Sequence, residues 1–299
     1  MKKILRVKRI WMAALLACLV LTSVVSMQAE DKVFLWQISS ENGKSYVMGS
    51  IHLLKKEFYP LPEVIEKAFA DSQVLAVEAN LSPEKAMEVA ALTVKRGMYS
   101  GEDTLKDHIS EKTYQFAGKV LKEMGMDIAR FEKFKPWMLA MTVESMQLLK
   151  KGFDPNYGVD MHFLKKAAKE KEILELEGIG FQIDLFDSFT PKESEYFLFY
   201  TLQQASVEDE EIGQMAEAWA RGDAAAVENF ITRNIKKSPE LQSVYDKLFD
   251  DRNFKMADKI AAYLKTDKTY FVVVGAGHLV GKNGVIQLLK DKGFKVKQL

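Results

Sequence analysis

The sequence predicts an α/β protein with α+β character, in which a mixed central sheet is assembled from N- and C-terminal segments. Strand-like apolar runs occur within residues 32–79 and again within 269–299, whereas residues 82–265 have mainly helical periodicity. No tandem repeat, low-complexity tract or proline-rich linker interrupts the sequence. We therefore expect a single domain over residues 30–299, of which about 82–265 form a large, mostly helical insertion.

The first 29 residues differ in composition from the rest. A basic start precedes an apolar stretch from Ile10 to about Val25, and small and polar residues follow as far as Ala29. This pattern predicts a Sec-type signal peptide cleaved near Ala29, and hence a periplasmic, cell-surface or secreted protein. One alternative is a retained membrane anchor, although the apolar run is slightly shorter than the roughly 20 residues of a spanning helix. Another is a lipoprotein attached through Cys18.

Charge balance and cysteine content exclude several classes of function. The chain has 42 basic and 42 acidic side chains, so no net field attracts nucleic acid or anionic lipid. We expect no nucleic-acid partner, and membrane contact only through the N-terminal segment. Cys18 is the single cysteine of the sequence, and its removal with the signal would leave no thiol. Any metal must then be held by His, Asp, Glu or backbone oxygens.

The N-terminal elements begin with a predicted hairpin. The apolar runs KVFLWQIS and SYVMGSIH flank Asn42-Gly43, a dipeptide typical of tight turns between antiparallel strands. Pro62 follows at a position typical of a helix start, and apolar residues recur after it at helical spacing. The run QVLAV predicts a buried strand that closes at Glu78.

The middle of the chain is predicted to be helical apart from one short strand. A helix is expected from about Val159 to Glu170, followed by a strand from about Ile173 to Leu176 that ends at Glu177. Residues 180–264 have a helical pattern almost throughout.

The C-terminal segment mirrors the opening unit. A β-branched run predicts a strand, and a glycine-rich turn carrying His278 follows it. A helix from about Gly284 to Lys292 and a last strand complete the chain. Strand, helix and strand thus occur at both ends of the sequence.

Two nearly identical phrases carry the strongest functional signal. YVMGSIHLL and VVVGAGHLV each place Gly-x-x-His after an apolar run, which puts His52 and His278 at strand ends. Glu78 and Glu177 close two further predicted strands, and functional groups of open α/β sheets gather just outside such ends. Imidazole and carboxylate donors suit zinc, manganese or iron. We expect His52, His278 and Glu78 to hold a divalent metal, with Glu78 acting either as a ligand or as a general base.

Each of these candidates also has a structural explanation. A strand-end histidine can simply be hydrogen-bonded, and Glu78 follows an apolar run where a carboxylate is paired, ligating or at the solvent edge. Glu177 lies in the acidic stretch LELEG, where it can be solvated or cap a helix. His162 lies near the start of a predicted helix and can face the core edge, the site or solvent. We retain His162 as a substrate-binding candidate.

Three further polar residues lie where predicted helices begin. Asp160 is accounted for by its place at a helix N-terminus, where a negative charge is favourable. Arg252 and Asn253 open the amphipathic helix within RNFKMADKIAAYL, and an asparagine there can be a cap. Sequence position alone therefore gives these residues no required role in chemistry.

Four blocks of the sequence together resemble the TraB/GumN family (TraB/PrgY/GumN), which includes the Tiki proteins. The resemblance runs in order from about Val33 to the C-terminus. The blocks are YVMGSIHLLKKEFYPLPEVIEKAFADSQVLAVEAN, GVDMHFLKKAAKEKEILELEG, RNFKMADKIAAYL and FVVVGAGHLVGKNGVIQLLKDKGFKVKQL.

The resemblance implies roles for individual residues. Tiki relatives are metal-dependent proteases whose paired Gly-x-x-His motifs and an acidic residue form the active site, which corresponds to His52, Glu78 and His278 here. Arg252 becomes a candidate catalytic residue that binds an oxyanion or a substrate carboxylate. By the same resemblance Asn253 becomes a candidate for substrate binding. Glu177 stays a catalytic candidate because it closes a neighbouring strand.

These observations together predict an exported metal-dependent hydrolase, a peptidase of Tiki type, acting on a peptide or another small molecule. Gly-x-Ser-x-Gly, a Walker-type phosphate loop and His-Glu-x-x-His are all absent from the sequence. Two alternatives come from the wider superfamily that the resemblance implies. One is a haem- or metal-binding protein like ChaN, and the other is a metal-free hydrolase like erythromycin esterase, with histidine as general base.

Overall fold

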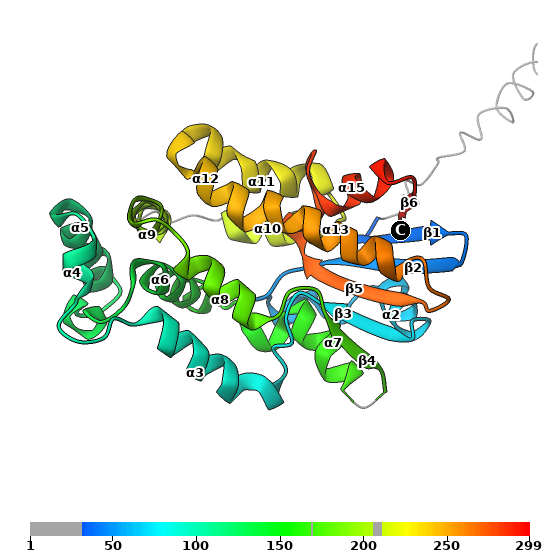
Figure 1. Ribbon diagram of the computed structural model, residues 1–299, viewed down its shortest axis with the longest axis horizontal. Coiled ribbons are helices and arrows are strands. Elements are labelled where there is room, and N and C mark those ends of the chain that lie inside the picture. Colours follow the sequence, from blue (N-terminus) through cyan, green and yellow to red (C-terminus); the bar gives the residue numbers. More distant parts are fainter. Residues whose placement is uncertain (1–31, 169, 206–210) are drawn as a thin grey trace, which may run out of the picture. The chain divides into compact units, whose positions relative to one another are not determined.

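The computed structural model describes residues 32–168, 170–205 and 211–299. The predicted signal peptide and Cys18 lie outside these described residues. Six strands form one sheet in the order β4-β3-β5-β2-β1-β6 (Figure 1). The strands are β1 (Leu35–Ser40), β2 (Gly43–Ser50), β3 (Val74–Val77), β4 (Glu172–Glu175), β5 (Tyr270–Gly275) and β6 (Lys295–Gln298).

The sheet is mixed, as the sequence predicts. Strands β4, β3, β5 and β2 run parallel to one another, and β1 lies antiparallel between β2 and β6. Five of these strands come from the two ends of the chain, and only β4 comes from its middle. The α/β fold class and the bipartite origin of the sheet are therefore confirmed.

The predicted hairpin forms between β1 and β2. The register pairs Leu35 with Met48 and ends with Ser40 opposite Gly43. Gly43 has a φ of 140°, a backbone conformation that residues with a side chain rarely adopt. The Asn-Gly signal therefore marks the place where the chain reverses.

Helices make up most of the remaining described residues. They are α2 (Glu63–Ala70), α3 (Ala86–Gly97), α4 (Leu105–His108), α5 (Glu111–Glu123), α6 (Pro136–Lys150), α7 (Val159–Ala167), α8 (Ile179–Asp187), α9 (Pro191–Ala205), α10 (Glu211–Ala220), α11 (Ala224–Lys237), α12 (Gln242–Tyr245), α13 (Asp251–Tyr263), α14 (Ala276–Leu279) and α15 (Val285–Asp291). A π-helical turn, Asp246–Asp250, joins α12 to α13. None of the helices in the described ranges is both long and apolar enough to cross a membrane.

Aromatic and aliphatic side chains fasten helices to both faces of the sheet. Phe163 of α7 packs against Phe69 of α2, with 4.9 Å between ring centroids, and against Phe271 of β5 at 4.7 Å. Helices α13 and α15 lie on the opposite side of the sheet (Figure 1), and α13 buries Met256 and Ile260 there. This packing holds one end of α13 beside the parallel strands.

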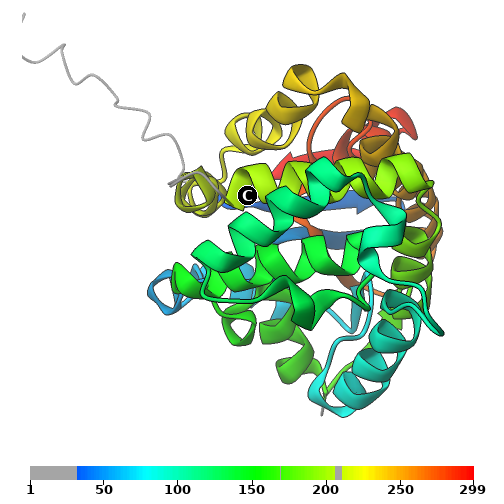
Figure 2. The ribbon, with the colours of Figure 1, turned by 90° about the vertical axis from the view of Figure 1, so that its left-hand side faces the viewer.

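A second apolar core lies within the helical middle of the chain. Helices α4, α5, α6 and α9 contribute buried side chains to it, among them Leu121, Leu139 and Leu198. Figure 2 looks from the side of these helices and shows them in front of the sheet.

Two predicted boundaries differ from the structure. Helix α7 ends at Ala167 rather than near Glu170. The amide of Glu170 bonds to the carbonyl of Ala167, three residues back, which tightens the chain into a turn before β4 begins at Glu172. His278 lies in the short helix α14 rather than in an open turn. The glycines around His278 led us to expect a turn, but the chain goes directly from β5 into this single helical turn.

Candidate active site

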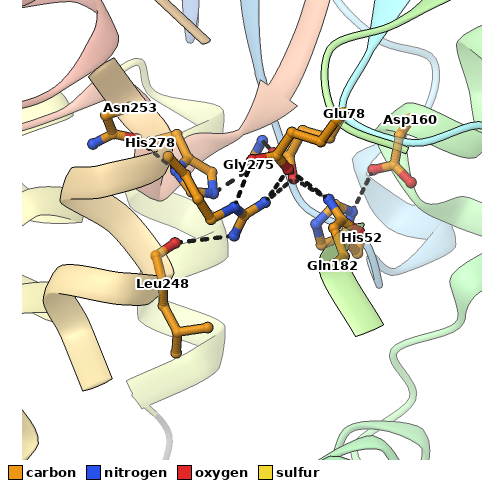
Figure 3. A network of polar contacts seen from close by, with 10 residues as sticks. His52, Glu78, Asp160, Gln182, Leu248, Asn253, Gly275 and His278 are labelled. Carbon is orange, nitrogen blue, oxygen red and sulfur yellow. Dashed lines mark hydrogen bonds and ion pairs between the residues drawn. The ribbon is translucent and has the colours of Figure 1, made fainter. Parts of the chain in front are cut away.

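Four polar side chains gather at the carboxyl ends of the four parallel strands. His52 follows β2 by two residues, Glu78 follows β3 directly, Glu177 follows β4 by two residues, and His278 follows β5 by three. Figure 3 shows Glu78 with His278 on one side and His52 on the other. The structure thus brings the two Gly-x-x-His motifs to one place, although 226 positions (278 − 52) separate the histidines.

Glu78 lies at the centre of this cluster and is only 6% exposed. Its Oε1 accepts a 2.5 Å hydrogen bond from the amide of Gly275 and lies 3.8 Å from His278 Nε2. Its Oε2 accepts bonds from Arg252 Nη2 at 2.8 Å and Gln182 Nε2 at 3.0 Å. Burial by itself would raise the pKa of Glu78, but His278, Arg252 and His52 outweigh it and lower this pKa to about 2. Glu78 is therefore a carboxylate at neutral pH.

Arg252, from the first turn of α13, neutralises two buried carboxylates. Its Nη2 bonds to both Glu78 and Glu177, its Nε bonds to Glu177 at 2.9 Å, and its Nη1 donates to the carbonyl of Leu248 at 2.9 Å. Although burial acts to lower the pKa of Arg252, these carboxylates raise it. In this structure the guanidinium of Arg252 positions the Glu78 carboxylate, and Glu177 in turn positions the guanidinium.

His278 is buried and its ring orientation is fixed. Its Nδ1 lies 2.7 Å from Asn253 Oδ1, and Asn253 Nδ2 donates to the carbonyl of Asn283 at 3.0 Å. Because the Asn253 oxygen can only accept, Nδ1 of His278 carries the proton. Burial lowers the pKa of His278 to about 4, so the ring is neutral near pH 7 and its Nε2 lone pair faces Glu78.

His52 lies on the opposite side of Glu78 and is more accessible. Its side chain is 53% exposed, and its Nδ1 lies 2.9 Å from Oδ1 of the buried Asp160 at the start of α7. The charge of the neighbouring Asp160 raises the pKa of His52 to about 9. Asp160 thus holds the His52 ring through Nδ1 and leaves Nε2 free to bind.

The free donors converge around Gly275. A Cβ atom placed on this glycine would lie 3.4 Å from Glu78 Oε1, 3.5 Å from His278 Cδ2 and 3.8 Å from His52 Nε2. Each imidazole has its Nδ1 fixed by an oxygen acceptor, which is the arrangement typical of metal-ligating histidines. In the described part of the chain, no three His, Asp or Glu side chains already stand at ligating distance from one point. The donor types, two imidazoles and a carboxylate, are of the kind that suits a zinc, manganese or iron ion.

Asn253 and His162, the two substrate-binding candidates, occupy different places. Asn253 is buried and orients His278, as described above. His162 lies on α7 outside the cluster, where its Nε2 bonds to Glu66 at 2.8 Å. It also borders an open hollow lined by Tyr59 and Tyr157.

Two residues of the cluster were not assigned to it from sequence. Asp160 was explained by the helix N-terminus, but its side chain contacts His52, 108 positions away in the chain. In the sequence GVDMH, Asp160 lies two residues before His162, and this closeness to a candidate histidine is the signal that could have indicated Asp160 as a site residue. Gln182 bonds to both Glu78 and Glu177 at 3.0 Å, and no local motif marks it.

Replacing Asp160 by asparagine is expected to lower the pKa of His52 from about 9 towards the ordinary value of about 6.5. The neutral amide no longer stabilises the imidazolium, so the change can be followed by NMR titration of the His52 ring protons. Because the folded-state pKa lies above the ordinary one, the ion pair stabilises the fold below about pH 6.5, and this contribution is lost as pH rises through about 9. As a control, Asp103→Asn, next to His108, should leave His52 unchanged. A His52 pKa that stays near 9 in Asp160→Asn would contradict the assignment.

Comparison with known proteins supports the resemblance noted in the sequence. The profile of the TraB/PrgY/gumN family matches residues 34–298. The uncharacterized protein YbaP of Shigella flexneri is 30% identical over 250 residues, covering 83% of this chain and 89% of YbaP, and YbaP of Escherichia coli (strain K12) gives the same values. The metalloprotease TIKI2 of Xenopus tropicalis is 35% identical over 85 residues, covering 25% of this chain and 16% of TIKI2. No solved structure gave a match.

The matched region begins within two residues of the first described residue and includes every member of the candidate site. The match therefore extends over nearly the whole described chain. This protein belongs to the TraB/PrgY/gumN family.

Proposed function

We propose that this protein is an exported metal-dependent hydrolase that cleaves peptides. The observation that carries the proposal is the pair of oriented imidazoles on either side of Glu78. His278 Nε2 lies 3.8 Å from Glu78 Oε1, and His52 Nε2 and Glu78 Oε1 both border the space in front of Gly275. The partial similarity to a protein named a metalloprotease favours a peptide substrate. The basic start and apolar run of the first 29 residues favour export.

His52 Nε2, His278 Nε2 and Glu78 Oε1 would be the ligands of a zinc, manganese or iron ion. When bound, such an ion supplies Lewis acidity, which polarises a carbonyl and lowers the pKa of water. We assign Glu78 as a ligand and not as the general base, because a carboxylate whose pKa is about 2 is a weak proton acceptor at neutral pH.

The surrounding residues keep these donors in position. Arg252 and Gln182 bind Glu78 Oε2 and thereby fix the direction of Oε1. Asn253 keeps the proton of His278 on Nδ1. The lone pair of Nε2 is therefore available to a metal ion without deprotonation of the ring. His52 is protonated below pH 9, so metal binding at neutral pH would release one proton from this ring.

Calorimetric titration of zinc and manganese into chelator-stripped protein tests the proposal. We expect one ion per chain in the wild type and a loss of affinity greater than about 100-fold in His278→Ala, more than the 10- to 100-fold typical of losing an outer partner. His108→Ala is the matched control, because His108 is stacked on Tyr99 outside the cluster and should bind metal as the wild type does.

Activity assays separate the proposal from its alternatives. Digestion of a peptide library that stops on chelation and returns on adding zinc or manganese would support a metallopeptidase. Hydrolysis that survives chelation would instead indicate metal-free chemistry. Absence of metal binding together with a Soret band on haem titration, lost in His52→Ala, would indicate a haem-binding protein.

A further inference from the structure

The hydroxyl group of Ser50 is a buried polar group that the contacts described so far do not use. Ser50 is the last residue of β2, lies opposite Gly275 in the parallel pair with β5, and is 3% exposed. Its Oγ has no hydrogen-bond partner among the described residues. Burying a hydroxyl without a partner is unfavourable, so such a group calls for a ligand.

Ser50 borders a small hollow beside the candidate metal ligands. The hollow has a volume of about 20 Å³, and its polar lining residues besides Ser50 are His52, Glu78, Asp160 and Gln182. A cavity needs roughly 10–15 Å³ and two to four polar partners to hold one water molecule. The size therefore admits a single water and excludes the side chain of a substrate.

The lining also determines how a water would be oriented. Glu78 and Asp160 are hydrogen-bond acceptors when ionised, whereas the Ser50 hydroxyl can both donate and accept. A water there can donate its protons to carboxylate oxygens while its own oxygen accepts from Ser50 Oγ. The remaining lone pair of the water is then left for another bond.

We propose that Ser50 is a positioning residue that holds the hydrolytic water in this hollow. The inference rests on the proposed function for the role of this water in hydrolysis. The location of the water rests only on Ser50 and the hollow. In hydrolysis the water oxygen bonds to the carbonyl carbon as the carbon–nitrogen bond breaks. One water proton goes to the leaving amine, and the other remains with the new carboxyl group.

The first test concerns the water itself, in wild-type protein and in Ser50→Ala. A crystal structure of the wild type should contain a water within hydrogen-bond distance of Ser50 Oγ, and the alanine variant should lose it or displace it. The thermal midpoint of Ser50→Ala should not exceed that of the wild type. A dry hollow together with a raised midpoint would overturn the inference, because removing a truly unpaired hydroxyl stabilises a fold.

The second test separates this inference from the proposed function. Ser50→Ala should bind zinc like the wild type, because Ser50 is not a ligand, while kcat for peptide hydrolysis falls about 100-fold with KM unchanged. Ser72→Ala, which removes another buried hydroxyl bonded to the carbonyl of Ala68, should leave kcat unchanged. If wild-type protein binds no zinc, the proposed function fails while the water site is still judged by the crystal structure. An unchanged kcat in a metal-binding Ser50→Ala variant would overturn the positioning role.

Discussion

Replacing Arg252 by methionine is expected to destabilise the protein by roughly 3–5 kcal/mol, the usual cost of removing one partner of a buried ion pair. The side chains of Glu78 and Glu177 are 7% and 4% exposed, and Arg252 is the cation bonded to both. Methionine fills part of the space but leaves the two carboxylates close together without this compensating charge. Urea denaturation at pH 7 measures the change in unfolding free energy.

A control at the surface shows whether burial matters. Arg221 pairs with Glu217 at 3.7 Å with both side chains about two-thirds exposed, so Arg221→Met should change stability by less than about 1 kcal/mol. If both arginine variants lose similar amounts, the loss at Arg252 does not come from buried charge.

The pH dependence of the Arg252→Met effect identifies its cause. In the wild type the pKa of Glu78 is lowered to about 2. The interactions of the ionised carboxylate therefore stabilise the fold fully above the ordinary pKa of glutamate, and this stabilisation is lost as pH falls through about 2. Without Arg252 the pKa of Glu78 rises, and protonation removes the unfavourable charge at a higher pH. The difference in stability between variant and wild type should therefore shrink as pH falls from 7 towards 3. A constant difference would indicate lost packing.

Much of the site could be predicted from the sequence because its members follow strands. Apolar runs locate strand ends within one or two residues, and parallel strands bring their carboxyl ends to the same edge of a sheet. This reasoning places His52, Glu78, Glu177 and His278 together, and the structure has them in one cluster. The hairpin could be predicted for a similar reason, since Asn42-Gly43 is a local signal of chain reversal.

The supporting contacts could not be predicted, because they depend on how helices pack. Asp160 lies on α7, which packs against the sheet through Phe163 and other buried side chains, and there it meets His52. Gln182 reaches Glu78 from α8. The sequence also does not show that Arg252, which we expect to bind an oxyanion or a substrate carboxylate, lies between the carboxylates of Glu78 and Glu177. An amphipathic pattern shows that a helix is packed, but not which residue its polar edge will meet.

Replacing Gly275 by alanine is expected to abolish metal binding while leaving the fold intact. The added Cβ would occupy the space in front of Gly275, at ordinary contact distances of 3.4–3.8 Å from Glu78, His278 and His52. The backbone of Gly275 has φ −52° and ψ 137°, which alanine adopts without strain. Its amide is retained and can still donate to Glu78. Folding should therefore change by less than about 1 kcal/mol, whereas the position open to an ion is filled.

Two measurements on the same preparations separate the consequences of Gly275→Ala. Calorimetry with zinc measures metal binding, and thermal unfolding measures the stability of the fold. Affinity for zinc should fall more than about 100-fold, as for loss of a ligand rather than of an outer partner. Gly180→Ala is the matched control: Gly180 lies in α8 near Gln182, and a Cβ there meets nothing within 4 Å. That variant should bind zinc normally. Full zinc affinity in Gly275→Ala would place the ion away from the two Gly-x-x-His motifs and would remove the basis for assigning His52, His278 and Glu78 as ligands.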